Sequence, residues 1–408
     1  MNLSPDIGKK IKLYDLFCFA FGIFSCLTVL VDSLLVYSLP LVQLTSFVRV
    51  SLIGFSLLLC ILLLCIINRL SARLSALKWI VLLILFLVIF INSIVSNVQN
   101  YLIIYIFCLV ISDNDFEKAI KALGVGTSIG IFIVLVSLFL GIIPNLYEFR
   151  TELGVVVQTR VTLGFNMAVF LPGYYLNLGF IYIYLNRRKF SLVRCVIIII
   201  PAIIINHFTG GRASFVTLLV TSLTAFFVTN YFKNIKNLKK IASMLFYLNV
   251  GLFTLFFMVS VSIASNYNSS EFIQSLNELS SGRFLFYSLY WERYDATLFG
   301  QELLRVGTVR SRITGEPRMI LDNAFLTILL EGGILLTAIL SLSIFRLLKY
   351  LKNQLDIMSL IIWLSIILVF PFANNGMFFW RNPLIFQFSI FFGIMGSKKI
   401  KEKFQAVT

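Results

Sequence analysis

Residues 206–214, N-H-F-T-G-G-R-A-S, combine the residue types that are best suited to bind an anion. They join two strongly apolar runs and contain the chain's single histidine, His207, the pair Gly210 and Gly211, and Arg212. If the following run is a helix, its first free N–H groups and the positive end of its dipole face whatever lies above the glycines, and Arg212 adds a full charge. We therefore predict part of a site for a lipid-linked phosphate here.

A second group of polar residues lies in 321–334, L-D-N-A-F-L-T-I-L-L-E-G-G-I. Asp322 begins an apolar run, where it caps a helix N-terminus or orients an acceptor hydroxyl, and the two roles are compatible. Glu331 lies deeper in the run, where a carboxylate is costly unless it is paired, so we expect an arginine or a backbone group beside it. Gly332 and Gly333 are expected to permit close helix approach.

Arginine suits phosphate chemistry because its planar fork binds phosphate through two parallel hydrogen bonds and keeps its charge in a poorly hydrated site. When a glycosyl–pyrophosphate bond breaks, the leaving group gains negative charge, which placed arginines stabilise more in the transition state than in the ground state. The candidates, each near an expected span end or a glycine turn, are Arg160, Arg212 and Arg283.

The acceptor hydroxyl in such a reaction needs a base or at least an orienting acceptor. Asp322 is the leading candidate, followed by His207 and Glu292. For His207 the alternative is a structural hydrogen bond next to the glycine turn.

A metal ion would also stabilise a pyrophosphate, but it would need a carboxylate pair on the same side of the membrane. The D-x-D motif, Asp113-Asn114-Asp115, lies beside Glu117, Lys118 and Lys121, in a segment that we place in the cytoplasm and interpret as a solvated loop. The 6 cysteines lie within or at the edges of apolar runs. We therefore predict neither a metal site nor a cofactor.

The composition excludes a soluble protein. Hydrophobic residues make up 59% of the 408 residues, charged residues make up 13%, and the mean hydropathy is +0.95, more apolar surface than a soluble domain of this length can bury. The net charge of +16 is explained by membrane orientation, because no basic–aromatic pattern typical of nucleic-acid binding is present. We predict an all-α polytopic membrane protein that forms a single integral membrane domain over 1–408.

The apolar runs predict about twelve spans, at about 20 residues for each full crossing. They lie near 13–31, 47–67, 77–93, 98–112, 121–143, 165–185, 194–206, 213–230, 241–263, 322–346, 357–373 and 383–397. Several are short enough that one is a candidate re-entrant segment.

The positive charges predict the orientation, with both termini in the cytoplasm. Every lysine then lies on the cytoplasmic side, and the basic residues left on the outer side or near a span end are all arginines. They are Arg49, Arg150, Arg160, Arg212, Arg283, Arg293, Arg305, Arg310, Arg312, Arg318 and Arg381. We interpret this sorting as a phosphate-handling outer face; the alternative is that outer loops merely lose lysine under the orientation rule.

Two outer loops are long, at about 144–164 and 264–321. The second contains four arginines that line an entry path for lipid phosphates or are simply solvated, Arg305, Arg310, Arg312 and Arg318. It also contains Trp291 and the tyrosines Tyr287, Tyr290 and Tyr294, whose rings stack on sugars or lie at the level of the lipid headgroups.

Three features resemble the O-antigen polymerase and ligase superfamily of bacterial envelope enzymes. They are the T-G-G-R-A-S turn that opens a span, an arginine-bearing outer loop that ends in R-V-T-L-G-F, and D-N-A-F-L-T-I-L-L-E-G-G after a large outer loop. The resemblance covers about 144–334, and the twelve-span layout agrees with it. This chain resembles the Wzy-type members, which polymerise repeat units, more than it resembles the ligases. The ligases usually have a histidine where this chain has Asp322.

The resemblance implies a membrane glycosyltransferase fold of the GT-C-like kind with large extracytoplasmic loops. Its activity is transfer of a glycan chain from undecaprenyl pyrophosphate to the next undecaprenyl-pyrophosphate-linked repeat unit, outside the bacterial inner (plasma) membrane and without a metal. From the residues themselves we predict a catalytic role for Asp322, His207, Arg212 and Arg160. We predict a substrate-binding role for Arg150, Arg283, Arg293, Arg318, Gly210 and Gly211. The expected partners are the lipid-linked oligosaccharide, membrane lipid and, as a candidate, a chain-length regulator; nucleic acid is not among them.

Two other functions remain open at this stage. An O-antigen ligase is the near neighbour. A flippase for lipid-linked oligosaccharides has a similar number of spans, but it needs cations that line a cavity within the spans. This chain keeps its outer arginines in loops or at span ends, with Arg49 as the nearest exception.

Overall fold

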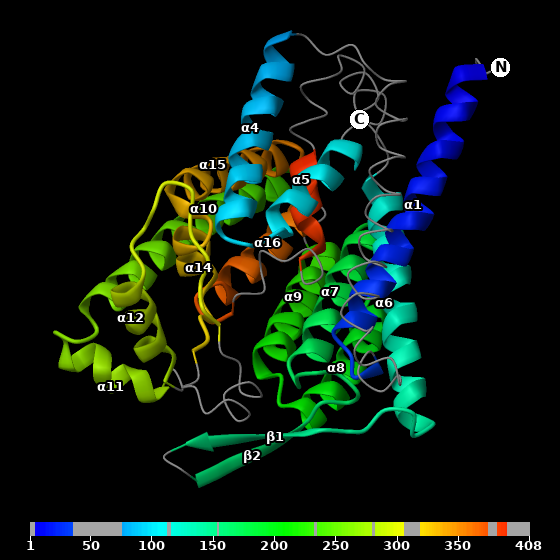
Figure 1. The fold of residues 1–408 in the computed structure, drawn as a ribbon. Coiled ribbons are helices and arrows are strands. Elements are labelled where there is room, and N and C mark those ends of the chain that lie inside the picture. Colours follow the sequence, from blue (N-terminus) through cyan, green and yellow to red (C-terminus); the bar gives the residue numbers. More distant parts are fainter. Residues whose placement is uncertain are drawn as a thin grey trace. The chain divides into compact units, whose positions relative to one another are not determined.

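The structure is a computed structural model, and it describes residues 5–35, 76–111, 116–152, 155–231, 235–279, 282–305, 319–373 and 382–389 (Figure 1). The chain forms two compact units. The first comprises Met1–Ser75, Ile106–Tyr231 and Pro383–Thr408, and the second comprises Ala76–Tyr105 and Phe232–Asn382.

Helices make up most of the first unit. Its elements are α1 (Pro5–Val31), α6 (Phe116–Phe139), α7 (Phe170–Leu185), α8 (Leu192–Thr209), α9 (Arg212–Tyr231), the hairpin β1 (Tyr147–Glu152) and β2 (Val155–Val161), and the 3₁₀ helix η2 (Pro383–Phe388). The helix α5 (Asn100–Ile111) runs from the second unit into the first.

Small residues let α1 and α6 pack backbone against backbone (Figure 1). A Cβ added at Gly126 would lie 2.0 Å from the carbonyl oxygen of Gly22, so no side chain fits there. Next to this crossing, the Ser25 hydroxyl lies 2.7 Å from the Thr127 hydroxyl and donates to the Leu123 carbonyl at 3.1 Å. Close packing and interhelical hydrogen bonds are what hold helices together where lipid removes the hydrophobic driving force.

Phenylalanine fills the interior of the first unit. Phe21 of α1 packs against Phe107 of α5 and Phe386 of η2, with ring centroids 4.7 and 5.5 Å apart. All three rings are buried. Such tilted and edge-to-face pairs are the favoured geometry for aromatic rings, so part of the high phenylalanine content serves packing between helices.

The predicted outer loop at 144–164 folds as an antiparallel hairpin. β1 and β2 pair with Tyr147 opposite Val161 and Glu148 opposite Arg160, with an irregularity between Arg150 and Thr151. The hairpin departs from the predicted all-α fold, in which 144–164 is an outer loop.

The second unit is built around the long helix α10 (Ile235–Asn266), which packs against α16 (Ile357–Val369) and α15 (Gly333–Asn353). The buried amide of Asn249 on α10 donates to the Leu360 carbonyl of α16 at 3.1 Å. The other elements are α4 (Ala76–Val95), α11 (Glu271–Leu279), α12 (Arg283–Arg293) and α14 (Ala324–Leu330).

The predicted span at 322–346 is interrupted in the structure. α14 ends at Leu330, Glu331 and Gly332 break the helix, and α15 begins at Gly333, whose φ is +80°. Glycine adopts this left-handed conformation without the steric cost that a side chain adds. The predicted loop at 264–321 contains α11 and α12, and its residues 306–318 lie outside the described residues.

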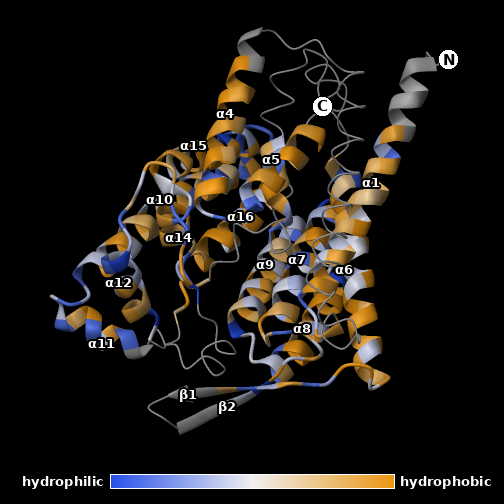
Figure 2. Ribbon diagram, viewed as in Figure 1, coloured by the Kyte–Doolittle hydropathy of each residue, from blue (hydrophilic) through white to orange (hydrophobic). Residues whose placement is uncertain are grey.

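Among the described residues, six helical stretches are long and apolar enough to cross a membrane (Figure 2). They are Leu13–Val31, Phe116–Phe139, Leu192–Thr209, Arg212–Tyr231, Asn237–Asn266 and Gly333–Asn353. Shorter apolar helices cover Ile80–Val95, Asn100–Ile111 and Ile357–Val369. The structure is therefore mostly helical, with helices long and apolar enough to cross a membrane, as expected for a helical membrane protein. The number twelve stays a prediction, since 47–67 and most of 383–397 lie outside the described residues.

The contact between Gly22 and Gly126 predicts how one added methyl group changes the stability of the protein. Gly126→Ala is expected to destabilise the protein by about 1–3 kcal/mol because the new Cβ overlaps the Gly22 carbonyl. Gly251→Ala on α10 is the matched control, since nothing lies within 4 Å of a Cβ added there. Thermal unfolding of the purified protein in detergent measures both. Equal melting of Gly126→Ala and the native protein would contradict the backbone contact.

Candidate functional site

The two glycines of the T-G-G-R turn have separate structural roles in the first unit. Gly210 ends α8 in the left-handed conformation, with φ +61°, and its N–H donates to the Asn206 carbonyl at 2.8 Å. Gly211 packs on Pro172 of α7, and an added Cβ would lie 2.6 Å from that ring. The turn therefore requires both glycines even without a ligand.

The start of α9 keeps the anion-binding features that the sequence predicts. Arg212 is exposed, and among the described residues its guanidinium has no partner. Its own N–H donates to the Gly210 carbonyl at 2.9 Å. The N–H groups of Ala213 and Ser214 have no acceptor within the part of the chain that the structure describes. Free N–H groups and a cation at a helix N-terminus are suited to a phosphate group.

His207 is exposed on the last turn of α8, and its ring packs edge-on against Phe208 with centroids 5.3 Å apart. Within the described residues it forms no hydrogen bond, so the structural hydrogen bond proposed as its alternative role is not observed. The neighbouring Thr209 hydroxyl instead donates to the Ile205 carbonyl at 2.7 Å.

The R-V-T-L-G-F segment joins the hairpin to the ends of two helices. The Thr162 hydroxyl accepts a hydrogen bond from the Leu146 N–H at 3.3 Å, and the Leu163 N–H donates to the Asn145 side chain at 3.1 Å. The Gly164 carbonyl accepts from the Leu34 N–H at 2.8 Å. Most of this motif therefore holds the base of the hairpin.

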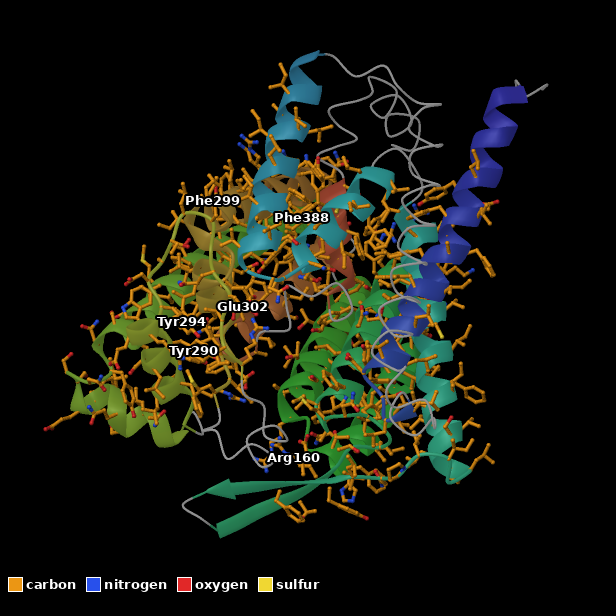
Figure 3. The ribbon with its side chains drawn as sticks, in the orientation of Figure 1. Arg160, Tyr290, Tyr294, Phe299, Glu302 and Phe388 are labelled. Atoms are coloured by element: carbon orange, nitrogen blue, oxygen red, sulfur yellow. The ribbon has the colours of Figure 1, made fainter. Side chains whose placement is uncertain are left out.

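Arg160 lies at that base, half-buried, opposite Glu148 in the strand register (Figure 3). Arg150 lies on β1 opposite Gln158. Both arginines belong to the first unit, as do His207 and Arg212.

In the second unit, Asn323 rather than Asp322 caps α14. The Asn323 side chain is fully buried, accepts from the Leu326 N–H at 3.0 Å and donates to the Ser260 hydroxyl at 2.9 Å. The capping role considered for Asp322 is therefore wrong. The Asp322 carboxylate is only half-buried and forms no hydrogen bond within the described residues.

Two charges act on the buried hydroxyl of Tyr287. This hydroxyl donates to the Pro371 carbonyl at 2.5 Å and lies 3.3 Å from the Asp322 carbonyl oxygen. Burial raises the pKa of Tyr287, the Arg283 guanidinium lowers it, and the Asp322 carboxylate raises it. Arg283, the first residue of α12, and Asp322 thus lie within electrostatic range of one group.

Glu331 has the arginine partner that the sequence analysis predicts. One guanidinium nitrogen of Arg305 donates to both carboxylate oxygens, at 2.8 and 2.9 Å. The Glu331 side chain is 4% exposed and that of Arg305 is 36% exposed, so the acid is inside and the cation is at the surface. Arg305 has no other partner among the described residues, which leaves its remaining N–H groups available to a ligand.

Asn92 joins the helix break to the neighbouring loop. Its buried amide donates to the carbonyls of Phe299, Glu331 and Gly332 at 2.8, 2.9 and 3.1 Å. The loop approaches so closely that a Cβ at Gly300 would lie 2.0 Å from the Glu331 carbonyl oxygen. Another segment does approach the glycine pair closely, but it is the loop that contains Leu298, Phe299 and Gly300, so the predicted approach of a helix is wrong.

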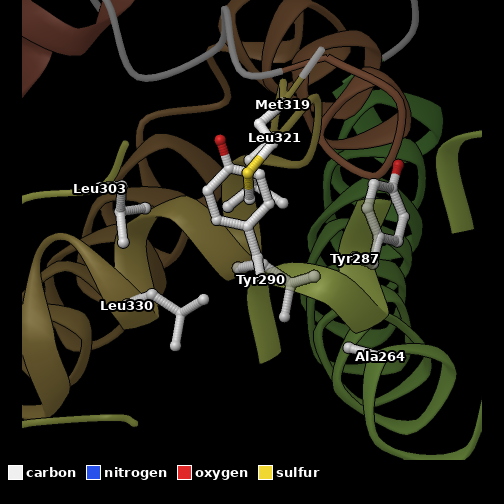
Figure 4. Close-up of a cluster of buried hydrophobic side chains, with 8 residues drawn as sticks. Ala264, Tyr287, Tyr290, Leu303, Met319, Leu321 and Leu330 are labelled. Carbon is white, nitrogen blue, oxygen red and sulfur yellow. The ribbon is translucent and has the colours of Figure 1, made fainter. Parts of the chain in front are cut away.

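Two tyrosines fix the chain beside Arg305. The Tyr290 hydroxyl donates to the Leu304 carbonyl at 2.6 Å, and the Tyr294 hydroxyl accepts from the Leu304 N–H at 2.9 Å. Tyr290 is fully buried against Leu303, Leu330 and neighbouring apolar side chains (Figure 4). Burial raises the pKa of Tyr290 to about 12, so the hydroxyl remains protonated.

These contacts correct the interpretation of the tyrosine cluster. Tyr287 and Tyr290 are core residues, and their rings are not available for sugars or lipid headgroups. Arg293 is exposed, with its guanidinium 5.7 Å from the Tyr294 ring centroid and one nitrogen 3.6 Å from the Met319 sulfur. Arg318 lies outside the described residues.

The structure therefore contains two groups of candidate residues. Arg150, Arg160, His207, Gly210, Gly211 and Arg212 belong to the first unit, and Arg283, Arg293 and Asp322 belong to the second. A common hollow for Arg160, Arg212 and Arg283 stays a prediction. Within the described residues no group of three or more histidine, cysteine or acidic side chains is placed to hold a metal ion.

No family model, no curated protein and no solved structure matches the chain.

Sequence reasoning missed Asn92, which bonds to the backbone at the helix break, and Tyr290 and Tyr294, which fix the residue before Arg305. An asparagine within the apolar run of α4 is a weak signal, since a polar side chain in a span usually has an internal partner. Neither tyrosine carries a local signal, because each contacts Leu304, 14 and 10 residues away.

The Arg305–Glu331 ion pair predicts that replacing the arginine lowers stability more than replacing the glutamate. Arg305→Met should cost about 3 kcal/mol because it leaves a buried carboxylate without a partner. Glu331→Gln should cost about 1 kcal/mol, since the half-exposed guanidinium can be hydrated and the amide still accepts a hydrogen bond. Thermal unfolding of both variants and of the double variant measures the difference. The pairing would be contradicted if Glu331→Gln were the more damaging change, or if the two effects simply added.

Proposed function

We propose that the protein is a polysaccharide polymerase of the O-antigen or capsule type. It transfers a glycan chain from undecaprenyl pyrophosphate to the next undecaprenyl-pyrophosphate-linked repeat unit, on the outer side of the bacterial plasma membrane and without a metal ion. The sequence motifs suggest this class. The single observation that carries it is the Asp322 carboxylate, which the fold leaves without a hydrogen bond within the described residues, beside an asparagine that does the capping.

In this proposal Asp322 accepts the proton of the attacking sugar hydroxyl. The oxygen of the acceptor sugar forms a new bond to the anomeric carbon, and its proton passes to the Asp322 carboxylate. The Asp322 carboxylate is half-buried and forms no hydrogen bond within the described residues, so it is available for this step. Arg283, which acts on the same tyrosine hydroxyl as Asp322, contacts the substrate.

The leaving group is undecaprenyl pyrophosphate, which takes the electron pair of the breaking C–O bond. Within the first unit, Arg212 and the N–H groups at the start of α9 are suited to bind a phosphate group of the lipid carrier, and Arg160 at the base of the hairpin carries a second guanidinium. Arg150, Arg293 and Arg318 bind the lipid-linked chains. Gly210 and Gly211 let a phosphate approach the backbone. His207 is the second candidate to accept a proton.

Preorganisation supports the same proposal. Arg305 is held by a buried carboxylate on one side and by a backbone segment that two tyrosines fix on the other. A cation fixed in this way does not have to be ordered when substrate binds, which is where electrostatic catalysis gains its advantage. Within the proposed function Arg305 belongs with the substrate-binding arginines.

The polymerase proposal predicts a specific cellular phenotype. In cells that lack the protein, single repeat units should accumulate, and the native gene should restore long chains. Asp322→Asn should lower polymerisation by a factor of about 10² to 10⁴. Arg212→Lys should fail to restore chain length, because an ammonium group lacks the planar fork. Gel electrophoresis of the surface polysaccharide measures chain length.

Two exposed residues outside the candidate site provide matched controls, Asp295→Asn and Arg346→Lys, and both should restore long chains. Normal chain length with Asp322→Asn would contradict the proposal. Single repeats confined to the cytoplasmic side would indicate a flippase. Long chains that never reach their final anchor would indicate a ligase.

Catalysis without a metal predicts resistance to chelation. The candidate site residues that the structure describes present arginines and the Asp322 carboxylate, a set suited to a pyrophosphate rather than to a divalent cation. Purified protein with lipid-linked repeat units should keep its activity in excess EDTA. Inactivation by EDTA that magnesium or manganese reverses would contradict this part of the proposal.

A further inference from the structure

Two apolar grooves flank α6 in the first unit. One has a volume of about 440 Å³ and lies between α1 and α6, with Phe19, Gly22 and Ala122 among its lining residues. The other has a volume of about 380 Å³ and lies against α7 and α8, with Gly179 and Ile197 in its lining. Both are lined mainly by apolar side chains.

The two grooves share one ridge. Lys121, Val125 and Ile129 line both of them. Their spacing of four residues places them on one face of α6. Val125 and Ile129 are 52% and 49% exposed, so the ridge separates the two grooves and its side chains are accessible from both. From Lys121 to Ile129 the helix rises about 12 Å.

Lys121 is the free charge at one end of this ridge. The two acidic side chains described nearby already have cationic partners, since Asp15 pairs with Lys118 and Glu117 pairs with Arg187. Lys121 is exposed, and among the described residues it has no acidic partner. The loop charges predict that this end of α6 is cytoplasmic.

We propose that this ridge binds one anionic phospholipid with two acyl chains from the cytoplasmic leaflet. The phosphate contacts the Lys121 ammonium, and one chain lies in each groove on either side of Val125 and Ile129. The ridge length of about 12 Å fits within one leaflet, whose hydrocarbon half is about 15 Å thick. A basic residue between spans on the cytoplasmic side is a recognised setting for anionic headgroups. This site is separate from the proposed catalytic residues.

Native mass spectrometry of the full-length protein in detergent tests the proposal. Phosphatidylglycerol and phosphatidylcholine with identical chains are the probes. The native protein should retain one phosphatidylglycerol in preference to phosphatidylcholine. Lys121→Gln should lower that retention about fivefold, the factor expected for one lysine next to an anionic lipid. The matched control, Lys240→Gln, removes another exposed lysine from the predicted cytoplasmic side and should retain the lipid as the native protein does.

Three results would overturn the proposal. The first is undiminished phosphatidylglycerol retention by Lys121→Gln, and the second is equal retention of the two lipids by the native protein. The third is displacement of the lipid by millimolar inorganic phosphate, which would indicate a site for the headgroup alone. Thermal unfolding of Lys121→Gln without added lipid distinguishes loss of the site from loss of the fold.

Discussion

The second unit depends on the hydrogen bonds of one buried amide, that of Asn92. A helix broken inside a membrane protein exposes carbonyl groups that lipid cannot satisfy, and each one costs several kcal/mol if it is left alone. Asn92 donates to two carbonyls at the break and to one in the loop that packs on it. The interruption at Glu331 and Gly332 is tolerated because this amide and the closely packed loop replace the missing helical hydrogen bonds.

The same break determines the position of the Glu331 carboxylate. Glu331 follows the last residue of α14, with its backbone oxygen bonded to Asn92 and its side chain bonded to Arg305. Because two tyrosines fix Leu304, the residue before Arg305, backbone and side-chain contacts together determine where the guanidinium lies. The charged side chains of Glu331 and Arg305 are thus held in place by hydrogen bonds from uncharged residues.

Sequence patterns predicted the local features well. The glycine turn between α8 and α9 and the buried arginine partner of Glu331 each follow from the conformational and electrostatic needs of the residues themselves. The membrane character follows from composition. The hairpin at 147–161 was not expected, although V-V-V-Q-T-R-V is rich in β-branched residues, because its outer position favoured a plain loop.

The features that depend on distant contacts were not predictable. Asp322 and Asn323 are equally good helix caps in isolation, and the choice falls on Asn323 because its amide also reaches Ser260 and Pro371. Tyr287 and Tyr290 are amphipathic in sequence, and their burial depends on carbonyl acceptors elsewhere in the chain. The helix break follows the same logic, since its glycines also fit a continuous span if no loop packs against them.

The Arg305–Glu331 pair itself argues that this region does more than hold the fold. A buried ion pair is rarely more stable than an apolar pair of similar size, because removing charges from water costs about as much as their attraction returns. The two partners also differ in exposure, because the Glu331 side chain is enclosed and the Arg305 guanidinium lies at the surface, with N–H groups that have no partner among the described residues. A pair that presents a fixed cation to a ligand must leave the cation accessible on one side. The geometry is that of a guanidinium held ready for an anion, which is the property that the proposed pyrophosphate chemistry requires.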